Sequence, residues 1–142
     1  MQHIEQPFIN SIILADDDLD DIELFRDAVR QACPSVKLII AKDGKNLLDI
    51  LQLAPVPDSI VLDLNMPRID GKSCLKEIRK SKKFDGVVVI ILSTSNNRND
   101  IEGCMDDGAD YYYVKPDNYE HLVTLVHDLC HGKIKRSMNI PS

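Results

Sequence analysis

The sequence lacks two features that would each point to a particular class of protein. It has no C-x-x-C pair, because its four cysteines are widely spaced at positions 33, 74, 104 and 130. This spacing favours free thiols in a reducing compartment over a zinc or disulfide framework. It also has no excess of basic residues, since its net charge is −6. Nucleic acid backbones are bound by basic faces, so we expect no direct contact with DNA.

Long apolar runs are absent as well. No run approaches the roughly 20 residues that cross a bilayer. The first residues, Met1 to Glu5, lack the basic start and long apolar stretch of a signal peptide. We therefore expect a cytoplasmic protein without a membrane association. Aromatic residues make up only 5% of the chain, so aliphatic side chains must build the core of a single domain.

What the chain does contain is a series of five short apolar runs, separated by longer stretches with helical spacing. The runs are residues 11–15, 36–41, 59–62, 87–92 and 111–114. Strict alternation of strands and helices predicts right-handed βαβ units and a parallel sheet covered on both faces. We expect an α/β fold, a doubly wound (βα)5 sandwich whose five parallel strands have the flavodoxin-like order 2-1-3-4-5. The domain would span residues 11–132, between an N-terminal extension (1–10) and a C-terminal tail (133–142).

Polar residues follow four of the five apolar runs. Asp16 and Asp17 follow the first, Asp63 the third, Ser93 the fourth and Lys115 the fifth. The carboxyl ends of parallel strands meet at one edge of a doubly wound sheet, which is where ligands bind in such folds. We therefore expect these five side chains to gather in one place.

The chemistry of this group favours phosphoryl transfer. Three converging carboxylates repel one another unless a cation lies between them, and Mg²⁺ prefers such oxygen ligands. Lys115 is a point charge suited to a phosphoryl oxygen, and the Ser93 hydroxyl can donate a hydrogen bond to another. An aspartate can act as the nucleophile that accepts a phosphoryl group. The group therefore indicates reversible phosphorylation of Asp63.

Four motifs then resemble one known family. They are residues 12–18 (IILADDD), 61–71 (VLDLNMPRIDG), 92–94 (LST) and 108–116 (GADYYYVKP). They follow in the order and at the spacing of the receiver domains of two-component response regulators. The resemblance covers nearly the whole chain, and it implies a receiver of the chemotaxis type.

The resemblance implies a role for each residue of the metal site. Asp63 would be the phospho-acceptor, and it would share a Mg²⁺ ion with Asp17, a direct ligand. Asp16 would act on the ion mainly through water. The backbone carbonyl of Asn65 would supply a further ligand.

The resemblance also implies a switch. Ser93 would occupy the family's Thr/Ser position and Lys115 its lysine, and both would act in phosphoryl transfer. In the family the hydroxyl moves toward the phosphoryl group while an aromatic residue, here Tyr112, swings inward. Strand alternation places Tyr111 and Tyr113 on the opposite side from Tyr112. Members of the family usually hold the bond before the proline in the cis form, so we expect a cis bond between Lys115 and Pro116.

The residues after Ser93 narrow the resemblance. Many receivers have alanine directly after the Thr/Ser position, whereas this chain has Thr94, followed by Ser95. A similar Thr-Ser pair occurs in a subset of stand-alone regulators, including those paired with phytochrome-type kinases. The chain is thus expected to be a single-domain regulator that signals through protein contacts. Asn65 and Ser95, each two positions after a site residue, would leave water access open and give a short-lived to moderate phospho-state.

The resemblance implies partners but leaves three functions open. A sensor histidine kinase would supply the phosphoryl group, and the protein would catalyse only its own phosphorylation and dephosphorylation. A downstream protein would then read the switched surface, and a homodimer is compatible with this function. Alternatively, the protein would be a phosphorelay intermediate that passes the phosphate to a histidine phosphotransfer protein. A phosphate-independent pseudo-receiver is the third function, which the complete set of site residues disfavours.

Two charged segments have simpler interpretations. Asp18, Asp20, Asp21 and Glu23 are predicted to form the acidic first turn of a helix, where its dipole favours them. A basic third helix is predicted mainly to face solvent. Its basic residues are Lys72, Lys76, Arg79, Lys80, Lys82 and Lys83.

Overall fold

The computed structural model describes residues 8–134, in which strands and helices alternate strictly. The elements are β1 (Ser11–Ala15), α1 (Leu19–Ala32), β2 (Lys37–Ala41), α2 (Gly44–Leu53), β3 (Ser59–Leu62), α3 (Gly71–Lys80), the 3-10 helix η1 (Lys82–Phe84), β4 (Val88–Ser93), α4 (Arg98–Asp106), β5 (Tyr111–Val114) and α5 (Tyr119–Cys130). The predicted strands match β1, β3 and β5 at both ends. β2 begins one residue later than predicted, and β4 both begins and ends one residue later.

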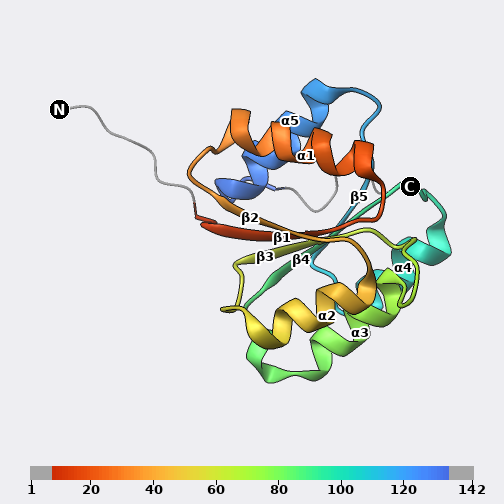
Figure 1. The fold of residues 1–142 in the computed structure, drawn as a ribbon. Helices are drawn as coiled ribbons and strands as arrows, with labels where there is room; N and C mark the ends of the chain where they lie inside the picture. The colour runs from red at the N-terminus through yellow and green to blue at the C-terminus, as the bar shows by residue number, and fades with distance from the viewer. Residues whose placement is uncertain (1–7, 135–142) are drawn as a thin grey trace.

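The strands form one parallel sheet in the order β2-β1-β3-β4-β5. This order confirms the predicted doubly wound sandwich. Helices α1 and α5 cover one face of the sheet, and α2, α3 and α4 cover the other (Figure 1). Strands enclosed in this way must be apolar on both faces, which is why β3 is buried along its whole length.

The core is divided by the sheet into two halves, and each strand alternates between them. In β5, Tyr112 packs in the half under α2, α3 and α4, whereas Tyr111 and Tyr113 pack in the half under α1 and α5. Both Tyr112 and Tyr113 are buried. The expected alternation of the three tyrosines is therefore confirmed.

Each helix begins at a side chain that satisfies a free backbone N–H group. The capping residues are Asp18, Asp43, Asp70, Asn97 and Asn118 for α1 to α5 in turn. Such residues accept the hydrogen bonds that a helix leaves unmade at its first turn. All five caps end the loops that follow the carboxyl ends of the strands, so they help to fix those loops at that edge of the sheet.

Most of the predicted N-terminal extension and C-terminal tail lies outside the described residues, so the predicted domain limits stay a prediction. Within the described part, Ile9 is buried against the α1 and α5 half of the core, and its N–H group donates to the carbonyl of Cys130. No helix in residues 8–134 has the length and apolar character needed to cross a bilayer.

Gly71 brings α3 against the end of β3. A Cβ atom at this position would lie 2.2 Å from the backbone oxygen of Asp63. The Gly71 N–H group donates to the carbonyl of Leu64 over 2.9 Å. Because the obstacle is backbone, which cannot rotate away, only glycine fits at this junction.

We expect Gly71→Ala to lower the free energy of unfolding by about 3 kcal/mol, because the methyl group must displace the chain at Asp63. Gly103→Ala is the matched control. A Cβ atom there meets nothing within 4 Å, so this helical substitution should raise stability by roughly 0.5 kcal/mol. Urea unfolding of both variants measures the difference, and equal stabilities would contradict the close approach.

Candidate functional site

Backbone hydrogen bonds beyond the strand ends hold the predicted site residues in register. The Asp63 N–H group donates to the carbonyl of Ala15 over 2.9 Å, and the Lys115 N–H group donates to that of Ser93 over 2.8 Å. The Asp16 N–H group continues the pairing with β2 in the same way. The sheet thus extends its hydrogen bonding by one residue on several strands, so the first polar residue after each strand has a fixed position.

The three predicted metal-binding carboxylates come together. Asp16, Asp17 and Asp63 each place one carboxylate oxygen within 4.8 Å of the others. Asp16 and Asp63 are buried, whereas Asp17 is exposed to solvent. Hard oxygen donors at such separations fit a divalent ion such as Mg²⁺ or Mn²⁺, which keeps waters on its open side.

Burial makes the ionised form of Asp16 unfavourable. Burial raises the pKa of Asp16, and the charge of Asp63 acts in the same direction. The N–H group of Asp18, which donates to Asp16 Oδ1 over 2.9 Å, and the nearby Lys115 oppose the rise without cancelling it. The carboxylates therefore gain from a bound cation, which would relieve both desolvation and repulsion.

The Lys115 ammonium places a positive charge beside these carboxylates. Its Nζ atom lies 3.0 Å from Asp16 Oδ2, 2.6 Å from Asp21 Oδ2 and 3.3 Å from Asp63 Oδ2. Burial alone would lower the pKa of Lys115, but the hydrogen bonds that it donates to Asp21 and Asp16 outweigh this effect and raise the pKa. The lysine is therefore a permanent positive charge beside Asp63.

Asp21 is the site residue that sequence reasoning missed. It was assigned to the acidic first turn of α1, yet its carboxylate makes the shortest of the three contacts with Lys115. One signal was available in the sequence. Asp21 lies three residues after the cap Asp18, so it follows the first strand by about one helical turn and stays close to the sheet edge.

The predicted switch residues are joined through Ser95. The buried Ser93 Oγ accepts a hydrogen bond from the Ser95 N–H group over 3.2 Å. The Tyr112 hydroxyl donates to the Ser95 carbonyl over 2.7 Å. Burial raises the pKa of Tyr112, so the hydroxyl keeps its proton. In this structure Tyr112 already points inward, and the loop after β4 connects it to Ser93.

Ser95 also reaches outward to α3 and α4. Its hydroxyl donates to Asp100 Oδ2 over 2.7 Å, and Lys72 Nζ lies 2.6 Å from Asp100 Oδ1.

Arg79 in α3 donates hydrogen bonds to the carbonyls of Gly108, Phe84 and Val87 and to Asp110. The prediction of a solvent-facing basic helix is therefore wrong for Arg79, because several tertiary acceptors lie within reach of its long side chain, whereas Lys72 stays half-exposed beside Asp100. The other four basic residues are exposed.

Two further predictions concern single residues near the site. The Asn65 N–H group lies 3.4 Å from Asp63 Oδ1, so the loop after β3 folds back toward the carboxylate. The role of the Asn65 carbonyl as a metal ligand stays a prediction. The expected cis bond before Pro116 is wrong, because no peptide bond in residues 8–134 is cis. The two forms of a bond before proline differ by only about 0.5–1 kcal/mol, so sequence resemblance does not fix the choice.

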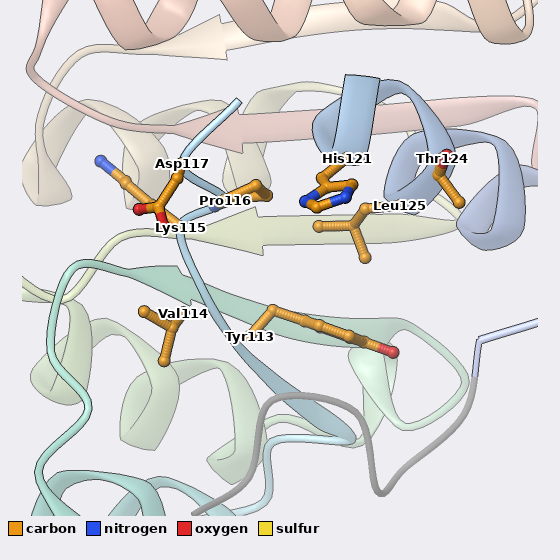
Figure 2. A pocket seen from close by; sticks show the side chains of 8 residues that line it. All are labelled: Tyr113, Val114, Lys115, Pro116, Asp117, His121, Thr124 and Leu125. Carbon is orange, nitrogen blue, oxygen red and sulfur yellow. The ribbon is translucent and has the colours of Figure 1, made fainter. Parts of the chain in front are cut away.

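A hollow of about 400 Å³ lies beside the site, between β5 and α5. Figure 2 shows that Pro116, His121 and Leu125 line it, while the Lys115 side chain extends away from His121 and Leu125. None of the three predicted metal-binding carboxylates lines this hollow. A smaller hollow of about 110 Å³ is lined by Asp16, Asp21 and Lys115 among others, but Asp63 does not line it either.

Comparison with known proteins gives a consistent result. Residues 12–127 match the family model of the response regulator receiver domain. Response regulator Rcp1 of Synechocystis sp. is 30% identical over 121 residues, which cover 81% of this chain and 82% of that protein. The structure is also similar to the phosphorylated cyanobacterial phytochrome response regulator RcpA, with a TM-score of 0.81 and 28% identity over 91% of this chain and 99% of the other. The Mn(2+)-bound form of Rcp1 has a TM-score of 0.79 and 26% identity, covering 94% and 99% of the two chains.

The carboxylate group predicts stabilisation by divalent ions. We expect Mn²⁺ or Mg²⁺ to raise the free energy of unfolding by about 2.7 kcal/mol when the ion is present at a hundred times its Kd. Asp17→Asn should abolish this effect, because it removes the exposed oxygen ligand. Asp20→Asn is the control, since Asp20 lies outside the carboxylate group. Thermal unfolding with and without the ion measures both, and equal responses in the two variants would contradict the assignment.

Proposed function

We propose, on the premise that the chain belongs to the response regulator receiver domain family, that Asp63 accepts a phosphoryl group from the phosphohistidine of a sensor histidine kinase. The chain is homologous to single-domain response regulators of two-component systems. Phosphorylation on an aspartate and Mg²⁺ binding are typical of this family. The assignment of those properties to particular residues is our proposal.

One observation carries the proposal. A buried carboxylate, Asp63, has a lysine ammonium 3.3 Å from its Oδ2 atom and two further carboxylates within 4.8 Å. A purely structural ion pair would need one partner for each charge, whereas here several carboxylates share a single cation. Such an excess of oxygen ligands is the arrangement that a metal-assisted phosphoryl transfer needs.

The residues divide the chemistry among them. An oxygen of Asp63 attacks phosphorus while the bond from phosphorus to the histidine nitrogen breaks, and that nitrogen keeps the electron pair and takes up a proton. The ammonium of Lys115 neutralises negative charge that develops on the phosphoryl oxygens. The Ser93 hydroxyl, once released from the Ser95 N–H group, donates to another of those oxygens. Hydrolysis later adds water to phosphorus, releases inorganic phosphate and restores the Asp63 carboxylate.

The metal belongs to the same proposal. Asp16, Asp17 and Asp63 would hold Mg²⁺, and the Asn65 carbonyl would complete the protein ligands. When bound, the ion supplies positive charge to the transferred group and aligns it with Asp63. The Mn²⁺-bound form of the similar Rcp1 supports this role.

The proposed output is a change of a protein-binding surface. The hydrogen bonds of Ser95 with Ser93 and Tyr112 support a switch, because movement of Ser93 toward a phosphoryl group must disturb the loop that also holds Tyr112. A downstream protein would bind the changed surface. A cytoplasmic location belongs to the proposal too, and the four free, buried cysteines fit a reducing compartment.

Phosphorylation itself can be tested directly. Incubation with acetyl phosphate and Mg²⁺ should add one phosphoryl group, detected by intact mass. Asp63→Asn should remove the gain, whereas Asp58→Asn, a change at another aspartate on the opposite edge of the sheet, should retain it. Absence of the gain in folded wild-type protein would sink the proposal.

The lifetime of the phosphorylated form gives a second test. Asn65 is exposed and Ser95 is small, so neither side chain closes the site to water. We expect a half-life of seconds to about an hour, measured by intact mass after removal of acetyl phosphate. A half-life of many hours would show that water is excluded, contrary to the expectation.

A further inference from the structure

The ammonium of Lys115 has no donor to spare. A lysine ammonium carries three N–H donors. Three carboxylate oxygens surround it, at 2.6 Å from Asp21, 3.0 Å from Asp16 and 3.3 Å from Asp63. Phosphorylation removes the charge of Asp63, which is the most distant of the three partners, and places new negative charge on the phosphoryl oxygens. The ammonium can bind these oxygens more closely when it also leaves one of its two remaining carboxylates, Asp16 or Asp21.

Exposure indicates which partner is released. The side chain of Asp16 is 4% exposed, so it cannot exchange the ammonium for water. The side chain of Asp21 is 36% exposed, and water can replace the lysine there. A released charge is tolerated where it can be hydrated and is strongly unfavourable where it stays buried.

The position of Asp21 supports the same conclusion. It lies in the first turn of α1 and outside the group of three carboxylates that could hold a metal. Loss of its contact with Lys115 would leave the metal ligands in place. Release of Asp16 instead would disturb the residue that anchors the loop after β1 through the Asp18 N–H group.

We propose that Asp21 is a positioning residue, which holds the Lys115 ammonium in the resting protein and releases it to the phosphoryl group on Asp63. This role rests on the proposed function and deepens it. Asp21 competes with the phosphoryl group for one cation, so it opposes phosphorylation without touching the reacting atoms. Its removal should strengthen the binding of any tetrahedral anion on Asp63 that needs Lys115.

Beryllofluoride is a suitable probe, because it forms a tetrahedral anionic adduct on a carboxylate. It is titrated in the presence of saturating Mg²⁺ and followed by NMR or tyrosine fluorescence. We expect Asp21→Asn to tighten the apparent affinity by roughly threefold to tenfold, the range for a partly exposed charge-assisted contact. Asp20→Asn removes the same charge from the same turn of α1, at a residue that is not among the three Lys115 partners. It should change the affinity by less than about twofold, from long-range charge alone.

A double-mutant cycle separates a role through Lys115 from a general charge effect. In a Lys115→Ala background, Asp21→Asn should change the affinity no more than Asp20→Asn does. A full effect of Asp21→Asn in that background overturns the positioning role. If Lys115→Ala does not fold, Lys115→Gln serves in its place, because it keeps the length of most of the side chain while it removes the charge.

A second measurement needs no comparison of affinities. The side-chain carboxyl carbon of Asp21, assigned in 13C NMR by its loss in Asp21→Asn, should shift when beryllofluoride and Mg²⁺ are added, because the lysine leaves it. The same carbon of Asp20 should move little. An unchanged Asp21 signal in protein that has bound beryllofluoride overturns the release.

The outcomes distinguish the two proposals. If folded wild-type protein binds no beryllofluoride in the presence of Mg²⁺, the proposed phosphorylation fails and the role of Asp21 fails with it. If wild-type protein binds beryllofluoride but Asp21→Asn and Asp20→Asn behave alike, only the role of Asp21 is overturned.

Discussion

The structure depends on one ion cluster, in which the Lys115 ammonium lies among carboxylates at the carboxyl edge of the sheet. Three carboxylates contact the lysine, and a fourth, that of Asp17, lies beside two of them, which leaves a formal excess of three negative charges. Two of those carboxylates are buried, where uncompensated charge is most unfavourable. The negative charge of the cluster is therefore only partly neutralised by Lys115. The remaining negative charge makes this edge of the sheet suitable for a divalent cation.

Strand register explains why these charges meet. Ala15 in β1 is opposite Leu62 in β3, so the next residues, Asp16 and Asp63, lie side by side. Ser93 in β4 is likewise opposite Val114 in β5, which places Lys115 just beyond the pair. A slip of one residue in any pairing would turn a charged side chain into the apolar core. The hydrophobic pattern that specifies the sheet therefore also specifies the site.

The sequence predicts those parts of the molecule that depend on local pattern. β1, β3 and β5 were located at both ends because a strand buried on both faces is a continuous apolar run that ends abruptly at a polar residue. Asp16, Asp17 and Asp63 followed directly from the same ends. Their convergence needed only the rule that parallel strands share a carboxyl edge.

Contacts between distant helices were not predictable in the same way. Asp21 and Lys115 are 94 residues apart, and their contact depends on where α1 enters relative to β5. An acidic residue in a first helical turn already has a sufficient local explanation, which hides its tertiary role. Arg79 and Lys72 were missed for a related reason. Their long side chains look solvated in the sequence, whereas their acceptors come from loops and from α4.

The loop after β4 connects the ion cluster to the rest of the molecule through very few bonds. Ser95 holds Ser93 by its N–H group, Tyr112 by its carbonyl and Asp100 by its hydroxyl. All three bonds belong to one residue, so Ser93, Tyr112 in β5 and Asp100 in α4 are linked through Ser95. Because Tyr112 is packed tightly in the core, its ring cannot adjust gradually. On the proposed function, a phosphoryl group on Asp63 would exchange the hydrogen bond between Ser93 and Ser95 for one from the Ser93 hydroxyl to a phosphoryl oxygen.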